Sequence, residues 1–182
     1  GRAMGAAVLF VKTSGGIEGW GRGGQPTRDL VFFEWGQGGA VLLTTPAGRH
    51  VLVDTGPGSA RSAAAQYAVL PYLQRRGIDR LDAAVVTHPD EDHLGGLPTL
   101  LREIKVDRVV QNGRRADTEL FSDVRRLVSQ NSADWETVAL RDPLPVDPAP
   151  RVRAHWPAPS VVGRSAEGDR GSVCSAVRSG PS

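Results

Sequence analysis

The sequence has very little cysteine, and its apolar residues do not form a long run. Of its 182 residues only Cys174 is a cysteine, which excludes an intrachain disulfide framework and a zinc site built from several cysteines. The longest apolar run near the start, Ala6 to Val11, is too short to cross a bilayer, and no convincing cleavage pattern follows it. We therefore expect no membrane span, and any metal ligands have to be histidines and carboxylates.

Positively and negatively charged residues are nearly equal in number, with 22 Lys and Arg against 20 Asp and Glu. The net charge of +2 produces only a weak field around the whole molecule, so an anionic partner would need a local basic patch. The length and the 40% hydrophobic content are sufficient for one globular domain with a sizeable core. We expect residues 1–28 to be a glycine-rich, weakly ordered leader, in which Val8–Lys12 can still add an edge strand, and residues 29–182 to form the domain.

Strands and helices are expected to alternate along this domain, as in an α/β fold. β-Branched and aromatic runs predict strands at residues 30–35, 40–45, 50–53, 81–87, 106–111, 136–140, 152–156 and 172–177. Helical periodicity predicts helices at residues 60–68, 71–76, 97–104 and 118–130, and Pro71 is expected to separate the first two.

Six consecutive residues, His88 to His93, offer two imidazoles and three carboxylates directly after the apolar stretch Ala83–Val86. Alternate residues of an extended segment share a face, so such a loop can turn several ligands toward one point. Histidine and carboxylate ligands together are typical of divalent metal sites. The simpler alternative is an acidic loop that caps a helix starting near Leu94, but capping needs only one acidic side chain. We favour the metal site.

Three segments of the sequence match a known pattern. They are Phe-Glu-Trp-Gly-Gln-Gly at 33–38, Val-Asp-Thr-Gly at 53–56, and a longer segment at 69–96 that ends in Thr-His-Pro-Asp-Glu-Asp-His-Leu-Gly-Gly. Together they closely resemble the metallo-β-lactamase-like domain of the ComEC competence proteins, a DNA-uptake channel family, and its stand-alone relatives. The common superfamily signature has histidine where this chain has Asp90, and the aspartate resembles the competence branch.

The resemblance implies a four-layer αβ/βα sandwich with a metal site at the edge between its two sheets. By the same resemblance His88 and Asp90 contribute to a first metal position, and Asp92 and His93 to a second. Asp92 is also our candidate for positioning the attacking water. We also expect Asp54 to be a catalytic residue, because it would support the segment His88 to His93 through hydrogen bonds. A simple Asx turn is the alternative role for Asp54.

The sequence departs from the family pattern in several places. Gly39 stands where the family usually has aspartate, and Ser172 alone carries over from an asparagine-rich family segment. We take Ser172 and Gln37 as candidate substrate-binding residues. His155 is a candidate third histidine ligand, with a solvated edge-strand histidine as the alternative. A Gly-Asp pair whose aspartate usually bridges two metals has no counterpart, so we expect the domain to be incomplete at its C-terminus.

The expected function is metal-dependent hydrolysis with one or two divalent ions. Zn²⁺ and Mn²⁺ are the first candidates, and Mg²⁺ is a further one because Asp90 makes the ligand set harder. The resemblance favours a nuclease that acts on DNA, in single-stranded form, during competence-type uptake. The paired arginines Arg114–Arg115 and Arg125–Arg126 would then contact phosphates, unless they are simply solvated.

Two other functions stay open at this stage. One is a hydrolase of the same superfamily that acts on a small ester, thioester or lactam, which an apolar cleft would favour over a basic groove. The other is a truncated, non-catalytic domain. The resemblance also implies a bacterial source and a membrane channel domain as partner in a longer parent protein, with an extracytoplasmic position in that case. The sequence itself leaves the compartment open.

Overall fold

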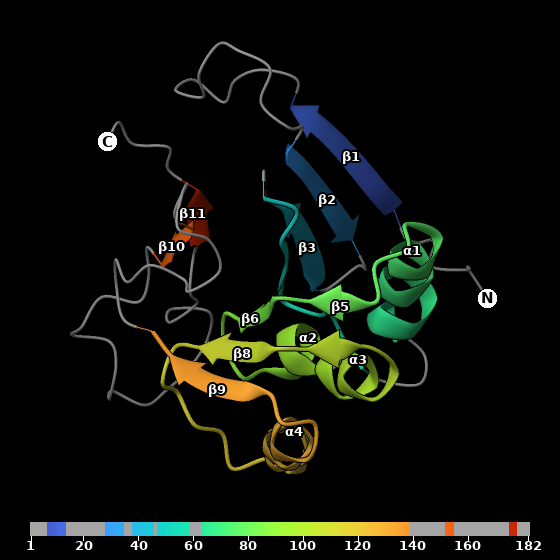
Figure 1. Cartoon of the computed structure of the whole chain (residues 1–182). Coiled ribbons are helices and arrows are strands. Elements are labelled where there is room, and N and C mark those ends of the chain that lie inside the picture. The colour runs from blue at the N-terminus through green and yellow to red at the C-terminus, as the bar shows by residue number, and fades with distance from the viewer. Residues whose placement is uncertain are drawn as a thin grey trace.

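A mixed sheet of seven strands organises the part of the chain that the structure, a computed structural model, describes (Figure 1). The described residues are 7–13, 28–34, 38–45, 47–58, 63–138, 152–154 and 175–177. The strands of the large sheet are β1 (Ala7–Thr13), β2 (Arg28–Glu34), β3 (Gly39–Thr44), β4 (His50–Val53), β6 (Ala83–Val86), β8 (Arg108–Gln111) and β9 (Asp134–Thr137). The helical elements are η1 (Ala65–Val69), α1 (Leu70–Arg75), α2 (Glu91–Leu94), α3 (Leu97–Glu103) and α4 (Glu119–Gln130).

The sheet changes from antiparallel to parallel at β4. Strands β1 to β4 form an antiparallel meander, whereas β4, β6, β8 and β9 are parallel neighbours in that order. Each parallel neighbour needs a crossover, and the segments containing α1, α3 and α4 supply these connections. The carboxyl ends of the four parallel strands consequently meet along one edge of the sheet, which is where open α/β sheets place their ligands.

Each face of the sheet carries a cluster of buried apolar residues. One face packs against all the described helices through a large cluster that includes Leu52, Ala84 and Val109. The opposite face presents a smaller buried cluster that includes Val51 and Val85. Because adjacent residues of a strand point to opposite faces, β4 and β6 contribute to both clusters. The apolar, two-sided character predicted for the strand at 81–87 is thus confirmed at β6.

Two predicted strands are each broken by an aspartate. The strand expected at 81–87 is β5 (Arg80–Leu81) followed by β6, and the one expected at 106–111 is β7 (Lys105–Val106) followed by β8. Strands β5 and β7 pair with each other in a separate two-stranded sheet. The carboxylate of Asp82 accepts a hydrogen bond from the backbone N–H of His50 at 2.8 Å, and that of Asp107 binds Arg80. These bonds hold the chain where it passes from one sheet to the other.

The predicted break at Pro71 is wrong. The chain stays helical from η1 into α1, and both Val69 and Leu70 keep right-handed helical dihedrals. The N–H of Leu70 bonds to the carbonyl of Ala65, five residues back, so the turn before the proline is a π turn. The wider turn accommodates a residue that has no N–H to donate. Ser59, the predicted N-cap, lies outside the described residues.

The ends of the chain agree with the predictions only in part. Strand β1 pairs with β2 at the edge of the sheet, as expected for residues 8–12. The strand predicted at 136–140 begins two residues earlier, as β9. Strands β10 (Val152–Ala154) and β11 (Ser175–Val177) pair antiparallel with each other. The boundary between a leader and a domain at residue 29 stays a prediction. Within the described ranges, no helix has the length and apolarity that crossing a membrane requires.

Candidate metal centre

The candidate ligand His88 and three residues near it lie at the carboxyl ends of neighbouring parallel strands. Asp54 directly follows β4, Thr87 and His88 follow β6, and Asn112 follows β8. Since β4, β6 and β8 are adjacent in the sheet, three segments that are far apart in sequence meet at this edge. All four side chains are nearly or fully buried. The sheet, rather than the loop alone, therefore builds the site.

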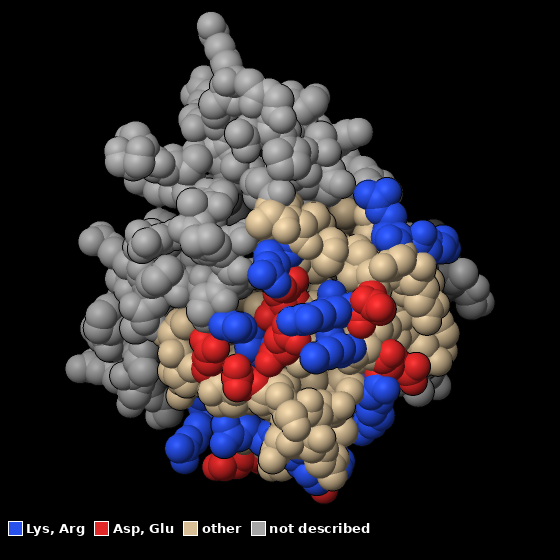
Figure 2. All heavy atoms as spheres, viewed as in Figure 1, with Lys and Arg blue, Asp and Glu red and all other residues tan. Residues whose placement is uncertain are grey.

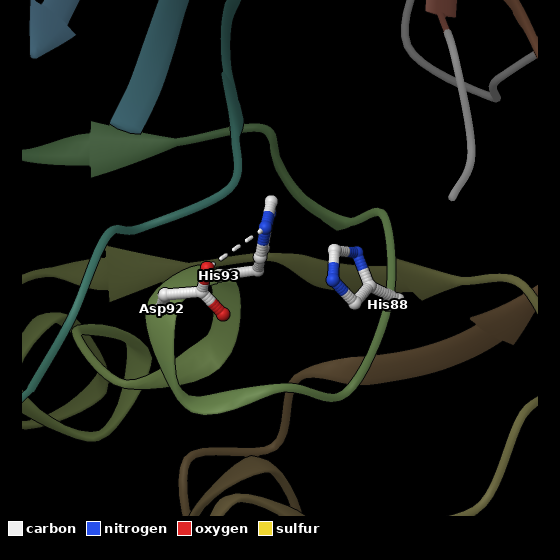
Figure 3. A group of neighbouring side chains, drawn as sticks. All are labelled: His88, Asp92 and His93. Carbon is white, nitrogen blue, oxygen red and sulfur yellow. Dashed lines mark ion pairs between the residues drawn. The ribbon is translucent and has the colours of Figure 1, made fainter. Parts of the chain in front are cut away.

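Three of the four predicted ligands are brought together. The ligand atoms of His88, Asp92 and His93 all lie within 4.8 Å of one another (Figure 3). The two imidazole rings lie side by side, with their centroids 3.7 Å apart and their planes inclined by 46°. A carboxylate oxygen of Asp92 lies 3.5 Å from Nε2 of His93, along the dashed line of Figure 3.

The local geometry of the ligand run differs from the extended loop that we predicted. Residues 87–90 form a bend, and Glu91–Leu94 form the single helical turn α2. Alternation along an extended chain would have placed Asp90 with His88 and Asp92 and turned His93 away. The helical turn instead brings His93 into the group. Asp90 occupies the N-cap of α2, and its side chain makes no capping bond.

Asp90 lies at the margin of this group. Its side chain is 62% exposed, and one of its oxygens lies 3.3 Å from Nε2 of His88. The carboxylate is thus next to the donor atom of His88 while facing solvent. Its role as a ligand stays a prediction.

Both carboxylate oxygens of Asp54 bind the segment that carries the candidate ligands, residues 87–93. One oxygen accepts a bond from the backbone N–H of Thr87 at 2.8 Å. The other oxygen is 2.8 Å from both the Thr87 hydroxyl and Nδ1 of His93. The residue adopts a left-handed backbone conformation with φ of 55°, which aspartate tolerates better than most residues. These contacts have the supporting geometry that we expected, and they join the segments after β4 and β6.

These hydrogen bonds indicate which nitrogen of each ring carries the hydrogen. A carboxylate has no proton to donate, so Nδ1 of His93 carries the hydrogen and Nε2 keeps its lone pair. The hydroxyl of Thr87 donates to Asp54 and can accept from Nδ1 of His88, which lies 3.2 Å away. In this arrangement Nε2 of each ring is the candidate metal-binding atom. Such tethers are the usual means by which proteins orient metal-binding imidazoles.

Thr87 and Asn112 are supporting residues that our sequence reasoning missed. The side-chain amide of Asn112 donates to the carbonyl of Thr87 at 2.7 Å, and its oxygen accepts from the N–H of Arg114 at 3.0 Å. Both side chains are buried, with 6% of Thr87 and 2% of Asn112 exposed. A signal was present in the sequence, because each is the first polar residue after a buried parallel strand.

Residues 54–58, the glycine loop after β4, contact α2 through backbone atoms. We call α2 the ligand helix because it carries Asp92 and His93. The N–H and the hydroxyl of Thr55 both donate to the carbonyl of His93 at 2.8 Å. A Cβ atom added to Gly58 would lie 2.0 Å from the carbonyl oxygen of Gly95. A Cβ atom on Gly38, the residue before β3, would lie 2.3 Å from the carbonyl oxygen of Asp92. The glycines are therefore required for the close approach of these loops, which fixes the position of α2.

The donor set fits a divalent cation. Two neutral imidazole nitrogens and one or two carboxylates form a borderline to hard ligand set, which suits Zn²⁺ and Mn²⁺. The supporting hydrogen bonds engage Nδ1 of each histidine, and one ligand atom of each residue lies within 4.8 Å of the others. His88 and His93 with Asp92 would hold the ion, with Asp90 at the solvent side.

Three predicted site residues lie outside the described residues. These are the candidate third histidine ligand His155 and the candidate substrate-binding residues Gln37 and Ser172. Gly39, which replaces the aspartate of the family pattern, is the first residue of β3.

Comparison with known proteins gives this site its context. Residues 33–164 match the family model of the metallo-beta-lactamase superfamily, and the chain belongs to that superfamily. Its fold class is thus the one that the sequence motifs implied, and the large sheet with its helical layer is the part that the described residues show in detail.

Among curated proteins, the chain is similar to bacterial competence and recombination proteins. It is 34% identical over 115 residues to competence protein ComA of Neisseria gonorrhoeae, an overlap of 62% of this chain and 15% of that protein. It is 38% identical over 78 residues to recombination protein 2 of Haemophilus influenzae, covering 43% and 10% of the two chains. With ComE operon protein 3 of Bacillus subtilis the identity is 34% over 94 residues, covering 45% and 12%. The chain thus spans only a small part of the length of these relatives.

Proposed function

We propose that this domain is a metal-dependent hydrolase that cleaves phosphodiester bonds of single-stranded DNA. The observation that carries the proposal is the convergence of the His88, Asp92 and His93 donor atoms within 4.8 Å. Thr87 lies against Nδ1 of His88 and Asp54 against Nδ1 of His93, which supports a pair of imidazoles held in place for a shared cation.

The side chains have distinct roles in this proposal. His88 and His93 hold the cation through Nε2, and Asp92 accepts a proton from the attacking water. A bound divalent ion supplies Lewis acidity toward a phosphoryl oxygen and lowers the pKa of a bound water toward neutrality. The side chain of Asp92 is 43% exposed, so it can exchange that proton with solvent. Asp54 acts through His93 and Thr87 and is a positioning residue.

The choice of DNA rests on the relatives and on the surface near the site. One of the similar proteins is named as a competence protein and another as a recombination protein, and both names refer to processes that act on DNA. A pocket at β8, the strand next to β6, is lined by Arg114, Arg115 and Arg125 together with both polar and aromatic side chains. A small-molecule esterase or lactamase would be expected to have a predominantly apolar cleft at this place.

The test is cleavage of end-labelled single-stranded DNA by the purified chain with Mn²⁺ or Zn²⁺, beside a His88→Ala, Asp92→Ala double variant. We expect metal-dependent cleavage by the wild type and a loss of at least about 100-fold in the double variant. Glu91→Gln is the matched control, because Glu91 belongs to the same run but bonds to the N–H of Gly58, which glutamine can replace.

Each outcome decides between the functions. Cleavage that survives the double change would place the chemistry elsewhere and refute the proposed site. Hydrolysis of a chromogenic ester without action on DNA would support the small-molecule function. Absence of both activities, with no metal bound at equilibrium, would favour a non-catalytic domain.

A further inference from the structure

A pocket of about 450 Å³ lies between strands β8 and β9 and helix α4, and β8 is the neighbour of β6, the strand that leads into the candidate metal ligands. Its lining comes from the ends of β8 and β9, the loop after β8, and α4, and comprises Gln111, Gly113, Arg114, Arg115, Phe121, Arg125, Trp135 and Thr137. We call it the arginine pocket. Its volume is within the range of sites that hold one small molecule or one nucleotide.

Strand pairing and hydrogen bonds connect the arginine pocket to the segment 87–93 that carries the candidate ligands. Gln111 pairs in register with Val86, the last residue of β6 before the metal ligands begin. The next residue, Asn112, binds the carbonyl of Thr87 with its amide group and the N–H of Arg114 with its oxygen. One buried side chain thus fixes the backbone of Arg114 relative to the loop that carries His88.

The aromatic side of the pocket is formed by side chains that pack against one another. The guanidinium carbon of Arg125 lies 4.6 Å from the ring centroid of Trp135, and the ring of Phe121 meets Trp135 edge-on at 5.8 Å. The stacked guanidinium keeps its N–H groups available at its edge. Flat π surfaces and available N–H donors are therefore combined within one small space.

The arginines of the pocket have no acidic partner among the described residues. Neither Arg114, Arg115 nor Arg125 takes part in any ion pair within that part of the chain. Arg126, one position further along α4, differs because it pairs with Asp123 and bonds to Gln130. On the face shown in Figure 2, positive and negative side chains are intermingled. Within the described ranges, the three arginines of the pocket therefore carry positive charge that is not paired with a carboxylate.

We propose that the arginine pocket binds one nucleotide unit of a single-stranded nucleic acid and so positions the strand for the metal centre. Arg114 and Arg115 contact the phosphates, and a base stacks on the surface formed by Arg125 and Phe121. This inference rests on the proposed nuclease function and adds the subsite that holds the substrate. A base has to be unpaired to reach an aromatic surface inside a pocket, which favours single strands over duplex.

Binding can be measured without catalysis. The full 182-residue chain is titrated, with EDTA present, into a fluorescein-labelled oligothymidylate of about 12 nucleotides, and anisotropy is recorded at several salt concentrations. We expect Arg114→Gln and Arg125→Gln each to raise Kd by about 5- to 10-fold. For Arg114→Gln, the slope of log K against log salt should also fall by about 0.7, which is the contribution of one phosphate contact in a single strand.

Arg126→Gln is the matched control, since it removes the same charge from the adjacent position of α4. We expect its Kd to stay within about twofold of wild type, as is usual for an arginine that makes only an exposed ion pair. An oligonucleotide of the same length with abasic sites tests the stacking surface. It should bind wild type about 5-fold or more weakly than oligothymidylate, and Phe121→Leu should reduce this difference.

The results separate this inference from the function on which it rests. Equal affinities and salt slopes for Arg114→Gln, Arg125→Gln and Arg126→Gln, in a chain that still cleaves DNA, would overturn the pocket and leave the nuclease. Arginine-dependent binding without cleavage under any metal would support the pocket and refute the nuclease. Far-UV circular dichroism and thermal melting establish that each variant is folded. Arg114 lies on a loop, so its replacement tests the pocket without disturbing the packing of Arg125 on Trp135.

Discussion

A carboxylate oxygen of Asp54 lies 2.8 Å from Nδ1 of His93, across 39 residues of sequence. This bond fixes the tautomer of a candidate metal ligand, and the hydroxyl of Thr87 shares the same oxygen. The site can therefore be disturbed without removing any ligand. Such changes distinguish a metal centre from a cluster of polar residues that merely stabilises the fold.

Asp54→Asn should weaken metal binding while the fold persists. Asparagine tolerates the left-handed backbone at this position, so little strain is added. Its amide group, placed at His93, would face the Nδ1 hydrogen with another donor and drive the ring toward the tautomer that blocks Nε2. We expect metal affinity to fall about 10- to 100-fold, measured by competition with a chromogenic chelator.

Asp82→Asn provides the comparison for this experiment. Asp82 is also a largely buried carboxylate, but it binds Arg49 and the N–H of His50, away from the metal centre. It should change the urea midpoint and leave metal affinity unaltered. Equal losses of metal affinity in the two variants would show that Asp54 acts only through general stability.

Thr87→Val should lower both stability and metal affinity. Valine has the shape of threonine but removes the hydroxyl that joins Asp54 to the histidines. We expect a loss of about 1–3 kcal/mol in the free energy of unfolding, because a buried carboxylate loses a donor. Thr87→Ser, which keeps the hydroxyl, should retain most of the metal affinity in the same titration. If serine were no better than valine, the role of the hydroxyl would be refuted.

Gly58→Ala should displace the ligand helix. The added methyl group would lie 2.0 Å from the carbonyl oxygen of Gly95. Because that oxygen belongs to the backbone, no side-chain rotation can relieve the clash. We expect a destabilisation of about 3 kcal/mol or more in urea unfolding, with weakened metal binding. Gly77→Ala is the control, since a Cβ atom there meets nothing within 4 Å and only the positive φ opposes it. It should cost about 1 kcal/mol and leave the metal centre intact.

His50 should make stability depend on pH in a defined window. Burial lowers the pKa of His50 below its ordinary value of 6.5, and the neighbouring carboxylate of Asp82 opposes this only in part. The unfolded chain therefore binds the proton more readily than the folded chain. The contribution is fully present above pH 6.5 and is lost as pH falls from there through the folded-state pKa.

The measurement for His50 is a comparison of urea midpoints in wild type and His50→Gln at pH values on both sides of 6.5. The other histidines are common to both proteins, so the difference between the two curves isolates His50. Wild type should lose more stability than the variant on acidification. Parallel curves would contradict the lowered pKa.

Much of the candidate site could be read from the sequence because its ligands are contiguous. His88 to His93 follow one buried strand, so a local pattern was sufficient to find them. The motifs also supplied Asp54, which lies far away along the chain. The helical turn α2 could not be read in the same way, since its position depends on contacts with the glycine loop after β4 and with Gly38.

The features that were missed depend on tertiary contacts. The sheet changes at Asp82 and Asp107 follow from hydrogen bonds to His50 and Arg80, each of which comes from another segment. The role of Asn112 likewise depends on β8 lying beside β6. Arg125 and Arg126 are adjacent in sequence and equally charged, and only the packing of α4 against β9 separates the pocket residue from the ion-paired one.

The backbone contact between the loop after β4 and the ligand helix also has a consequence for the folding reaction. Strands β4 and β6 are parallel, so they pair only after the whole intervening crossover has been enclosed, and contacts of such high sequence separation form slowly. Residues 88–93 are contiguous, yet their geometry is completed only when residues 54–58 dock against them. In a stopped-flow refolding experiment, high-affinity metal capture should therefore appear with the slow, global phase and not with the formation of early helices.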